Sequence, residues 1–263
     1  MDNIYIKSDK KIPIQQGVII NGCIAENYDF DTYGLIITPR CDIGNGGKVS
    51  TIHYLPIVPL EKWIIVDCLQ NSIRKFRNKL SEKLEKNEIS STLLEYLVNI
   101  DDFKTIVKEK PNKQNLIEEY SSFYKIIIDK NYDCKELLNY CNNEYSDLYS
   151  FRHNRFYLIK NWNNPNKYNV ILLRDIKRIS FDLIRQFPNG CQNKNFDEKV
   201  YLLNDIYKSD SVYYFKTITQ ISSPYIEYVI QQFSHNFCRI GVDHPINKDD
   251  IKSNYELEKI IKI

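Results

Sequence analysis

Apolar positions in the first part of the chain fall into short β-branched runs, a pattern that is typical of strands. Gly17 precedes the first run, and Pro39 and Pro59 end the second and the third. The runs occupy residues 18–20, 34–38 and 52–58. Three of the chain's eight glycines lie between the second and third runs, so the backbone there is expected to turn.

Beyond about residue 66 the apolar positions take the period of a helix. The first such stripe consists of Leu69, Ile73, Phe76, Leu80 and Leu84. Serines at 90 and 91 and aspartates at 101 and 102 are candidate caps for the segments that follow them. Two more apolar stripes, at 116–127 and 134–145, complete a helical segment.

Strand patterns return after residue 150. Runs at 155–159 and 170–173, separated by an Asn- and Pro-containing turn, predict a hairpin. Residues 176–181 either continue that strand or bend into another, and a further run leads to Ile221. Ser223 as N-cap, Pro224 at the first helical position and Gly241 at the stop predict a helix that packs on the strands.

These patterns predict an α+β protein in three parts. The parts are a barrel-like β domain at 1–66, a helical segment at 67–150, and a C-terminal β-sheet plus helix unit at 151–263. Both β parts are short for an independent core, so the alternative that they pack as one domain stays open.

Composition excludes several classes of protein. The chain has 263 residues, a net charge of +2 and 17 glycines and prolines in total, counting 8 Gly and 9 Pro, so collagen-like and Pro-rich disordered classes are excluded. No uncharged apolar run is long enough to span a bilayer. Seven cysteines show no zinc-ligand spacing, and no basic-apolar leader is evident. We therefore expect a cytoplasmic protein without a metal, a cofactor or a membrane partner.

The densest group of reactive side chains follows the second strand run. Arg40, Cys41 and Asp42 precede the glycine-rich turn, and His53 lies on the next run. A cation that lowers a thiol pKa, together with a histidine base, is the chemistry of cysteine catalysis. The alternative is structural, with Cys41 buried and Asp42 bonded to the turn amides. These four residues are the catalytic candidates.

Basic residues interleaved with aromatics are candidates for nucleic-acid contact, because such mixtures combine stacking with phosphate binding. The candidates are Lys48, Arg152, Arg155 and Lys160. The basic helical face at 74–86 offers a second patch, although a solvated surface is the alternative for both. The small net charge means that any nucleic-acid contact must be local.

The N-terminal pattern, from Gln16-Gly17-Val18 through Thr38-Pro39 to Tyr54-Leu55-Pro56-Ile57-Val58, resembles the small barrel of the MazF/Kid toxin family. The resemblance covers about 45 residues and implies an SH3-like barrel. The positions that hold the family's catalytic arginine and threonine are Thr32 and Val58 here. Without that cation, the family's ribonuclease chemistry lacks its transition-state stabilisation.

A second pattern resembles bacterial proteins of antiphage-defence and other mobile gene clusters. It combines Pro39-Arg40-Cys41-Asp42-Ile43 with Ser222-Ser223-Pro224-Tyr225 and Arg239-Ile240-Gly241. The resemblance implies an accessory subunit beside a separate effector or sensor protein encoded nearby.

Three functional hypotheses follow. The first is a non-catalytic binding or regulatory subunit of such a defence system, which contacts a partner protein and, in one version, RNA or DNA. Its candidate interface residues are Tyr225, Tyr228 and Arg239, and homo-oligomers are also compatible with it. The second is a MazF-like nuclease toxin with a noncanonical site around Arg40, Asp42 and His53. The third is a hydrolase centred on Cys41.

Overall fold

A computed structural model shows the fold of the chain. It describes residues 4–6, 12–44, 49–186, 190–193, 205–206, 208–209 and 212–238. Lys48, most of the glycine-rich turn, Arg239, Gly241 and the tail beyond them lie outside this set. Two compact units are present: a β unit, with described residues up to 62 and from 148 to 238, and a helical unit, residues 63–147.

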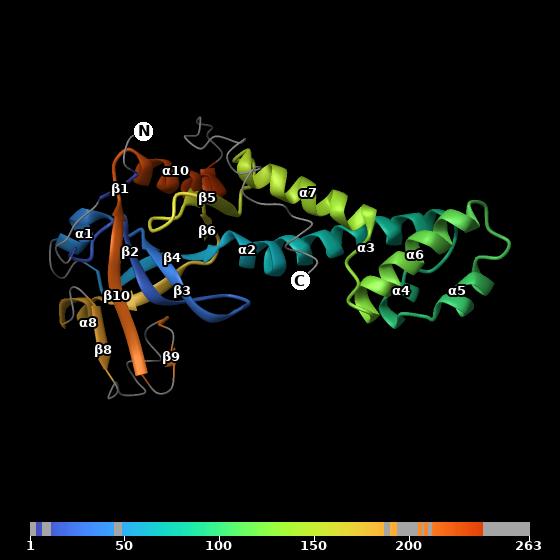
Figure 1. Cartoon of the computed structure of the whole chain (residues 1–263), viewed down its shortest axis with the longest axis horizontal. Coiled ribbons are helices and arrows are strands. Elements are labelled where there is room, and N and C mark those ends of the chain that lie inside the picture. The colour runs from blue at the N-terminus through green and yellow to red at the C-terminus, as the bar shows by residue number, and fades with distance from the viewer. Residues whose placement is uncertain are drawn as a thin grey trace. The chain divides into compact units, whose positions relative to one another are not determined.

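The β unit is built on one curled, half-barrel antiparallel sheet (Figure 1). The strand order is β1-β10-β2-β3-β4-β6-β5; β7 also pairs with β4, and β8 and β9 pair with β10. The strands are β1 (Tyr5–Ile6), β2 (Val18–Ala25), β3 (Tyr28–Ile36), β4 (Thr51–Pro59), β5 (Phe156–Lys160), β6 (Tyr168–Leu172), β7 (Lys177–Ser180), β8 (Gly190–Asn193), β9 (Lys208–Ser209) and β10 (Val212–Ile221). Strands from both ends of the sequence therefore belong to one sheet.

This architecture confirms the α+β class. The hairpin expected from the 155–159 and 170–173 runs is present as β5 and β6, and residues 177–180 form a separate strand that pairs with β4. The sheet extends well beyond a small barrel, because β10 from the C-terminal half pairs with β2 from the N-terminal half.

Both faces of the sheet are covered, which explains why β2 is buried along nearly its whole length. Alternate residues of the strand point to opposite faces. Val18 and Ile20 enter one core with Phe181, Leu183 and Ile184, while Ile19 enters another. The short helix α8 (Phe181–Gln186) supplies the three residues of the first core that follow β7.

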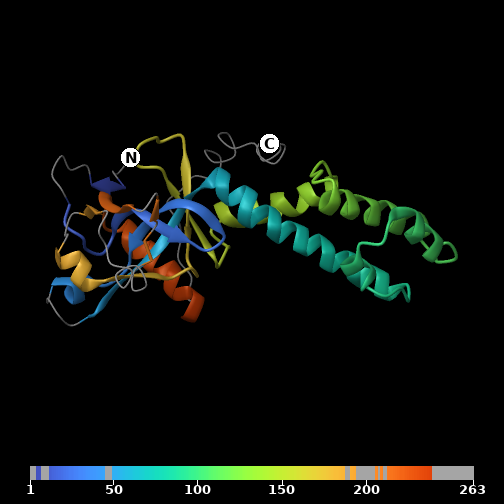
Figure 2. The same cartoon turned by 90° about the horizontal axis from the view of Figure 1, so that it is seen from below.

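The second core lies under α10 (Tyr225–Cys238), which crosses one face of the sheet in both views of the molecule (Figure 2). Its residues Ile226 and Val229 are almost fully buried against the strands. The helix begins two residues after Ser223, and the peptide bond between Ser223 and Pro224 is cis. The carbonyl of Ser222, rather than a side chain of the expected cap Ser223, accepts the first hydrogen bonds of the helix, from the amides of Tyr225 at 2.9 Å and Ile226 at 3.2 Å.

The close approach of β3 to β4 depends on Gly34. A Cβ at this position would lie 2.5 Å from Sγ of Cys23 and 2.7 Å from Cδ2 of Tyr54. Both neighbours are fully buried, so neither has room to move. Because Gly34 carries only a hydrogen in place of a Cβ, the Tyr54 ring can pack directly against the backbone of β3.

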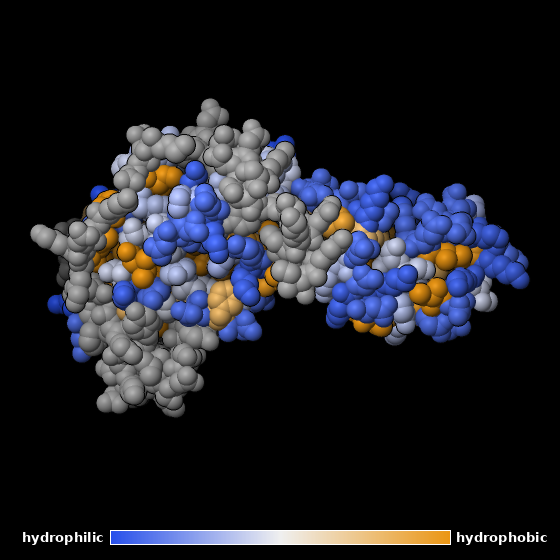
Figure 3. All heavy atoms as spheres, viewed as in Figure 1, coloured by the Kyte–Doolittle hydropathy of each residue, from blue (hydrophilic) through white to orange (hydrophobic). Residues whose placement is uncertain are grey.

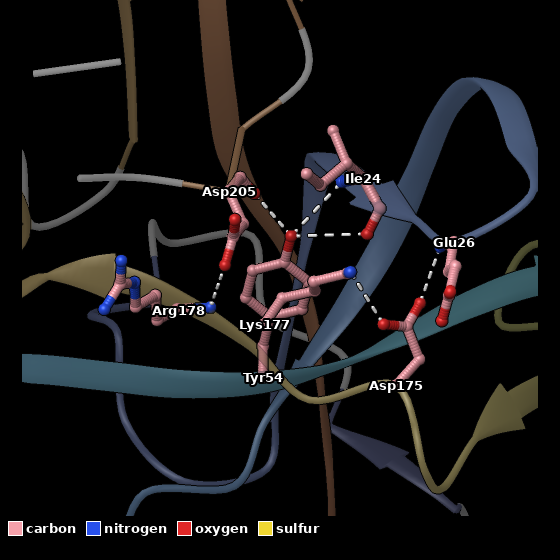
Figure 4. A network of polar contacts seen from close by, with 7 residues as sticks. All are labelled: Ile24, Glu26, Tyr54, Asp175, Lys177, Arg178 and Asp205. Atoms are coloured by element: carbon pink, nitrogen blue, oxygen red, sulfur yellow. Dashed lines mark hydrogen bonds and ion pairs between the residues drawn. The ribbon is translucent and has the colours of Figure 1, made fainter. Parts of the chain in front are cut away.

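The Tyr54 hydroxyl belongs to a network of polar contacts that links β2, β4 and β7 (Figure 4). It accepts a hydrogen bond from the amide of Ile24 at 3.2 Å and donates to the carbonyl of Asp205. The Asp205 carboxylate accepts from the amide of Arg178 at 2.7 Å. Nearby, Asp175 accepts from the amide of Glu26 at 2.7 Å and pairs with Lys177 at 2.8 Å. Burial raises the pKa of Tyr54 well above its ordinary value.

The helical unit packs its apolar stripes into a core of its own. Phe76 meets Phe123 edge-on at 6.1 Å between ring centroids, and Phe103 stacks on Tyr120 at 3.8 Å. The unit begins at the last residue of α2 (Leu60–Trp63). Its elements are the π-helical turn η1 (Ile64–Cys68), α3 (Leu69–Lys86), α4 (Leu93–Tyr96), α5 (Ile100–Ile106), α6 (Lys113–Ile128) and α7 (Lys135–Tyr149). The last residues of α7 belong to the β unit. The cap of α5 is Asn99, which accepts from the amide of Asp102, so the two aspartates expected as caps lie in the first turn instead.

The helical unit shows a mostly hydrophilic surface in Figure 3. Within it, part of the basic face of α3 is neutralised: Lys75 pairs with the buried Glu144, Lys83 with Glu119, and Arg77 with Glu95 at 3.4 Å. These pairs reduce the cationic charge that α3 offers to nucleic acid. Among the described residues, no helix is long and apolar enough to cross a bilayer.

Candidate functional site

A groove of about 770 Å³ opens in the β unit between α10, the start of β4 and the segment that follows β3. We call it the α10 groove. Its apolar lining consists of Ile37, Pro39, Val49, Ile176, Ile230 and Phe233. Its polar lining consists of Gln16, Thr38, Asp42, Ser50, Thr51, His53 and Ser234. A volume of this size and a mixture of apolar walls with a few polar groups are typical of ligand sites.

The local sequence explains how the polar groups reach the groove. Pro39 ends the β3 pairing, and the chain then forms α1 (Arg40–Gly44), whose amides at Asp42 and Ile43 bond back to the Pro39 carbonyl at 3.1 and 3.2 Å. The Thr38 hydroxyl accepts from the amide of His53 at 2.7 Å. This bond holds β4 beside the turn, and Asp42 and His53 consequently line the same groove.

Arg40, Cys41 and Asp42 form a helical turn and do not continue the strand that precedes them. Arg40 and Cys41 are exposed and do not line the groove. The Cys41 thiol donates a long hydrogen bond, 3.6 Å, to the Asp42 carboxylate. The structural alternative, in which Cys41 is buried, is therefore wrong.

Several polar side chains of the groove make few or no hydrogen bonds to the other described parts of the chain. Asp42 forms no ion pair there, and its carboxylate accepts only from Cys41. The His53 imidazole and the hydroxyls of Ser50 and Ser234 form no side-chain hydrogen bond to the described residues. These groups are available to a ligand.

A connected catalytic set is not present among the described residues of the groove. An activated nucleophile needs a base within about 3 Å, and a base in turn needs an orienting partner. Asp42 and His53 share the groove but do not hydrogen-bond to each other. Within the described ranges, no group of three or more His, Cys, Asp or Glu side chains is arranged to hold a metal ion.

The positions that correspond to the catalytic residues of the MazF/Kid family lie in the core. Thr32 is 2% exposed on β3, and its hydroxyl has no hydrogen-bond partner in the described structure. Val58 is fully buried on β4. Neither side chain can contact an RNA substrate in this conformation.

The nucleic-acid candidates lie around the edge strand β5 rather than in the groove. The guanidinium of Arg155 lies 5.1 Å from the ring centroid of Phe156, and His153 packs on the same ring at 4.6 Å. Arg152 is exposed, and Lys160 is half-buried at the end of β5, where its carbonyl accepts from Tyr5. Lys48 lies outside the described residues.

The interface candidates on α10 have different surroundings. Tyr225 packs against the core beneath the helix, so part of its side chain serves the fold. Tyr228 is half-buried, and burial together with the nearby Tyr228 raises the pKa of Tyr157. Arg239 lies outside the described residues.

The groove residues that sequence reasoning missed come from α10 and from the turn after β6. Ile230 and Phe233 fall at the apolar spacing of the helix expected after Pro224, which indicates packing rather than a site, and Ser234 and Ile176 carry no signal of their own. Comparison of the chain with known protein families, with curated proteins and with solved structures finds no match.

Proposed function

We propose that this chain is a non-catalytic binding and regulatory subunit of a bacterial antiphage-defence or related multi-protein system, and that it acts in the cytoplasm beside a separate effector or sensor protein. The α10 groove carries the proposal. It combines exposed apolar side chains with polar side chains, among them His53, Ser50 and Ser234, that form no side-chain hydrogen bond to the described residues. Such a surface is suited to holding a partner or ligand rather than to activating a nucleophile.

Co-purification with the products of the neighbouring genes tests this function. We expect a stable complex with one of these proteins. Ile176→Asp introduces a charge at an exposed apolar position of the groove, since Ile176 is 43% exposed, and Tyr96→Asp at an exposed position of the helical unit is the matched control. A chain that forms no complex with any neighbouring product would contradict the proposal.

A second candidate function is a ribonuclease on an SH3- or MazF-like barrel with a noncanonical site. The observation that favours it is that Asp42 and His53 line one groove. The test is cleavage of labelled RNA and DNA by the purified chain. Cleavage that is lost in His53→Ala but kept in His153→Ala supports it, and equal cleavage by both variants removes this site.

A further inference from the structure

We propose that the α10 groove binds a small organic cation, namely a molecule with an apolar body and one protonated amine. This inference goes beyond partner binding and does not depend on it. It rests on the charge and the shape of the groove lining.

The charge of the described lining favours a cation. Among the lining residues that the structure describes, Asp42 is the only carboxylate, and there is no lysine or arginine. The carboxylate forms no ion pair within the described residues and accepts one long bond from the Cys41 thiol. A carboxylate beside apolar surface interacts more strongly with a cation than it would in bulk water, because the local dielectric is lower.

The walls of the groove fit an apolar body attached to that cation. Ile230 and Phe233 are only partly buried by the sheet core below them, and Ile176 is 43% exposed. A ligand that covers these side chains removes apolar surface from water. An aromatic ring can also pack against Phe233.

The remaining polar groups complete the site. The hydroxyls of Ser50, Thr51 and Ser234 have no side-chain hydrogen bond to the described residues. Hydroxyls both donate and accept, so they can bind the N–H groups of an amine that Asp42 does not contact. A ligand with a carboxylate or phosphate in this place would face Asp42 and lose affinity.

The test is a matched series of three probes that share one apolar body. The probes are 4-phenylbutylamine, which is a cation at neutral pH, 4-phenylbutanol, which is neutral, and 5-phenylpentanoate, which is an anion on the same phenylbutyl body. Binding to the full-length chain is measured by calorimetry and by amide chemical shifts. We expect the cation to bind most tightly and the anion most weakly, with shifts at residues 37–42, 49–53 and 230–234.

Variants separate the contributions of charge and apolar contact. Asp42→Asn is expected to weaken the amine about fivefold, as loss of an ion pair of roughly 1 kcal/mol implies, and to leave the alcohol unchanged. Ile176→Ser is expected to weaken all three probes. Asp182→Asn, an exposed carboxylate on α8 outside the groove, is the control and is expected to change nothing.

Three results would overturn the assignment. They are the absence of saturable amine binding, an anion that binds as tightly as the amine, and an amine affinity that Asp42→Asn leaves unchanged. None of these bears on the partner complex, which is measured separately by co-purification. Conversely, a chain that binds the amine but no partner would retain the groove site and lose the proposed function.

Discussion

Substitution of Gly34 by alanine tests the packing that positions β3 and β4 and, with them, the groove. The new Cβ would meet Cys23 Sγ at 2.5 Å and Tyr54 Cδ2 at 2.7 Å, both closer than van der Waals contact allows. Both neighbours are fully buried in the sheet core. Overpacking of this kind costs about 1–3 kcal/mol. We place Gly34→Ala at the upper end, about 3 kcal/mol, because two neighbours must move rather than one.

Gly44→Ala is the matched control. No heavy atom lies within 4 Å of a Cβ at Gly44, and the residue ends the exposed helix α1. Alanine there is expected to change stability by less than about 0.5 kcal/mol. The two substitutions are chemically identical, so the difference between them reports the surroundings of Gly34.

Urea unfolding in a Trp63→Phe background is a suitable assay. The chain has two tryptophans, and this background leaves Trp162, which packs edge-on against Tyr33 at 4.7 Å in the β unit. Fluorescence then follows the β unit alone. Addition of Cys23→Ala removes the nearer contact, so the double variant is expected to lose less stability than the sum of the single variants by about 1 kcal/mol. Equal stability of Gly34→Ala and Gly44→Ala would refute the packing.

Three further predictions concern other parts of the chain. Tyr54→Phe is expected to cost about 1–3 kcal/mol, because the Asp205 carbonyl and Ile24 amide lose their partner. Burial raises the Tyr54 pKa, so the contribution of the neutral hydroxyl to the free energy of unfolding is present below the ordinary tyrosine pKa near 10 and is lost as pH rises above it. Chemical unfolding at neutral and alkaline pH should therefore show that Tyr54→Phe loses less stability at alkaline pH than the unsubstituted chain. An identical loss of stability would contradict the assignment. Lys75→Met removes the cation beside the buried Glu144 and is expected to destabilise the helical unit by about 1–3 kcal/mol. Lys79→Met on the exposed face should change its stability by less than about 0.5 kcal/mol. Thermal melts of the two variants that coincide in circular dichroism would refute the role of the Lys75–Glu144 pair. Peptide mapping after brief iodoacetamide treatment should find Cys41 modified before Cys23, Cys68, Cys134 and Cys141, because Cys41 is exposed and the other four are buried; equal modification of these five would contradict the burial.

The sequence predicted the elements whose patterns are local. The apolar stripe from Leu69 to Leu84 repeats at helical spacing and forms α3, and the β-branched runs beginning at Val18 and Ile52 form β2 and most of β4. Local spacing also revealed the β5 and β6 hairpin, because the Asn- and Pro-containing segment between the runs is a strong turn signal.

Local sequence patterns do not predict which strands pair over a long distance in the chain. Nothing in the residues of β10 specifies that they pair with β2, about 200 positions earlier in the chain, because strand partners are set by tertiary packing. The groove shows the same limit. Asp42 and His53 were recognised as candidates from their position around a turn, while Ile230 and Phe233 reached the same surface only through the docking of α10.

Short elements were missed for a different reason. The helical turn at Arg40–Gly44 has a glycine at its end and a proline before it, so its residues read as a turn. The carbonyl of Pro39 nevertheless accepts the hydrogen bonds that start a helical turn. An extended strand would place Cys41 and Asp42 on opposite faces, and the turn changes the directions of both side chains. This local change exposes Cys41 and brings Asp42 to the groove.

The most direct test of the central claim is native mass spectrometry of the chain expressed together with the products of its neighbouring genes. We predict a heteromeric complex of fixed stoichiometry that Ile176→Asp weakens and Tyr96→Asp does not. A chain that stays alone under these conditions, and that cleaves RNA in a manner that depends on His53, would contradict the claim that it is a non-catalytic subunit.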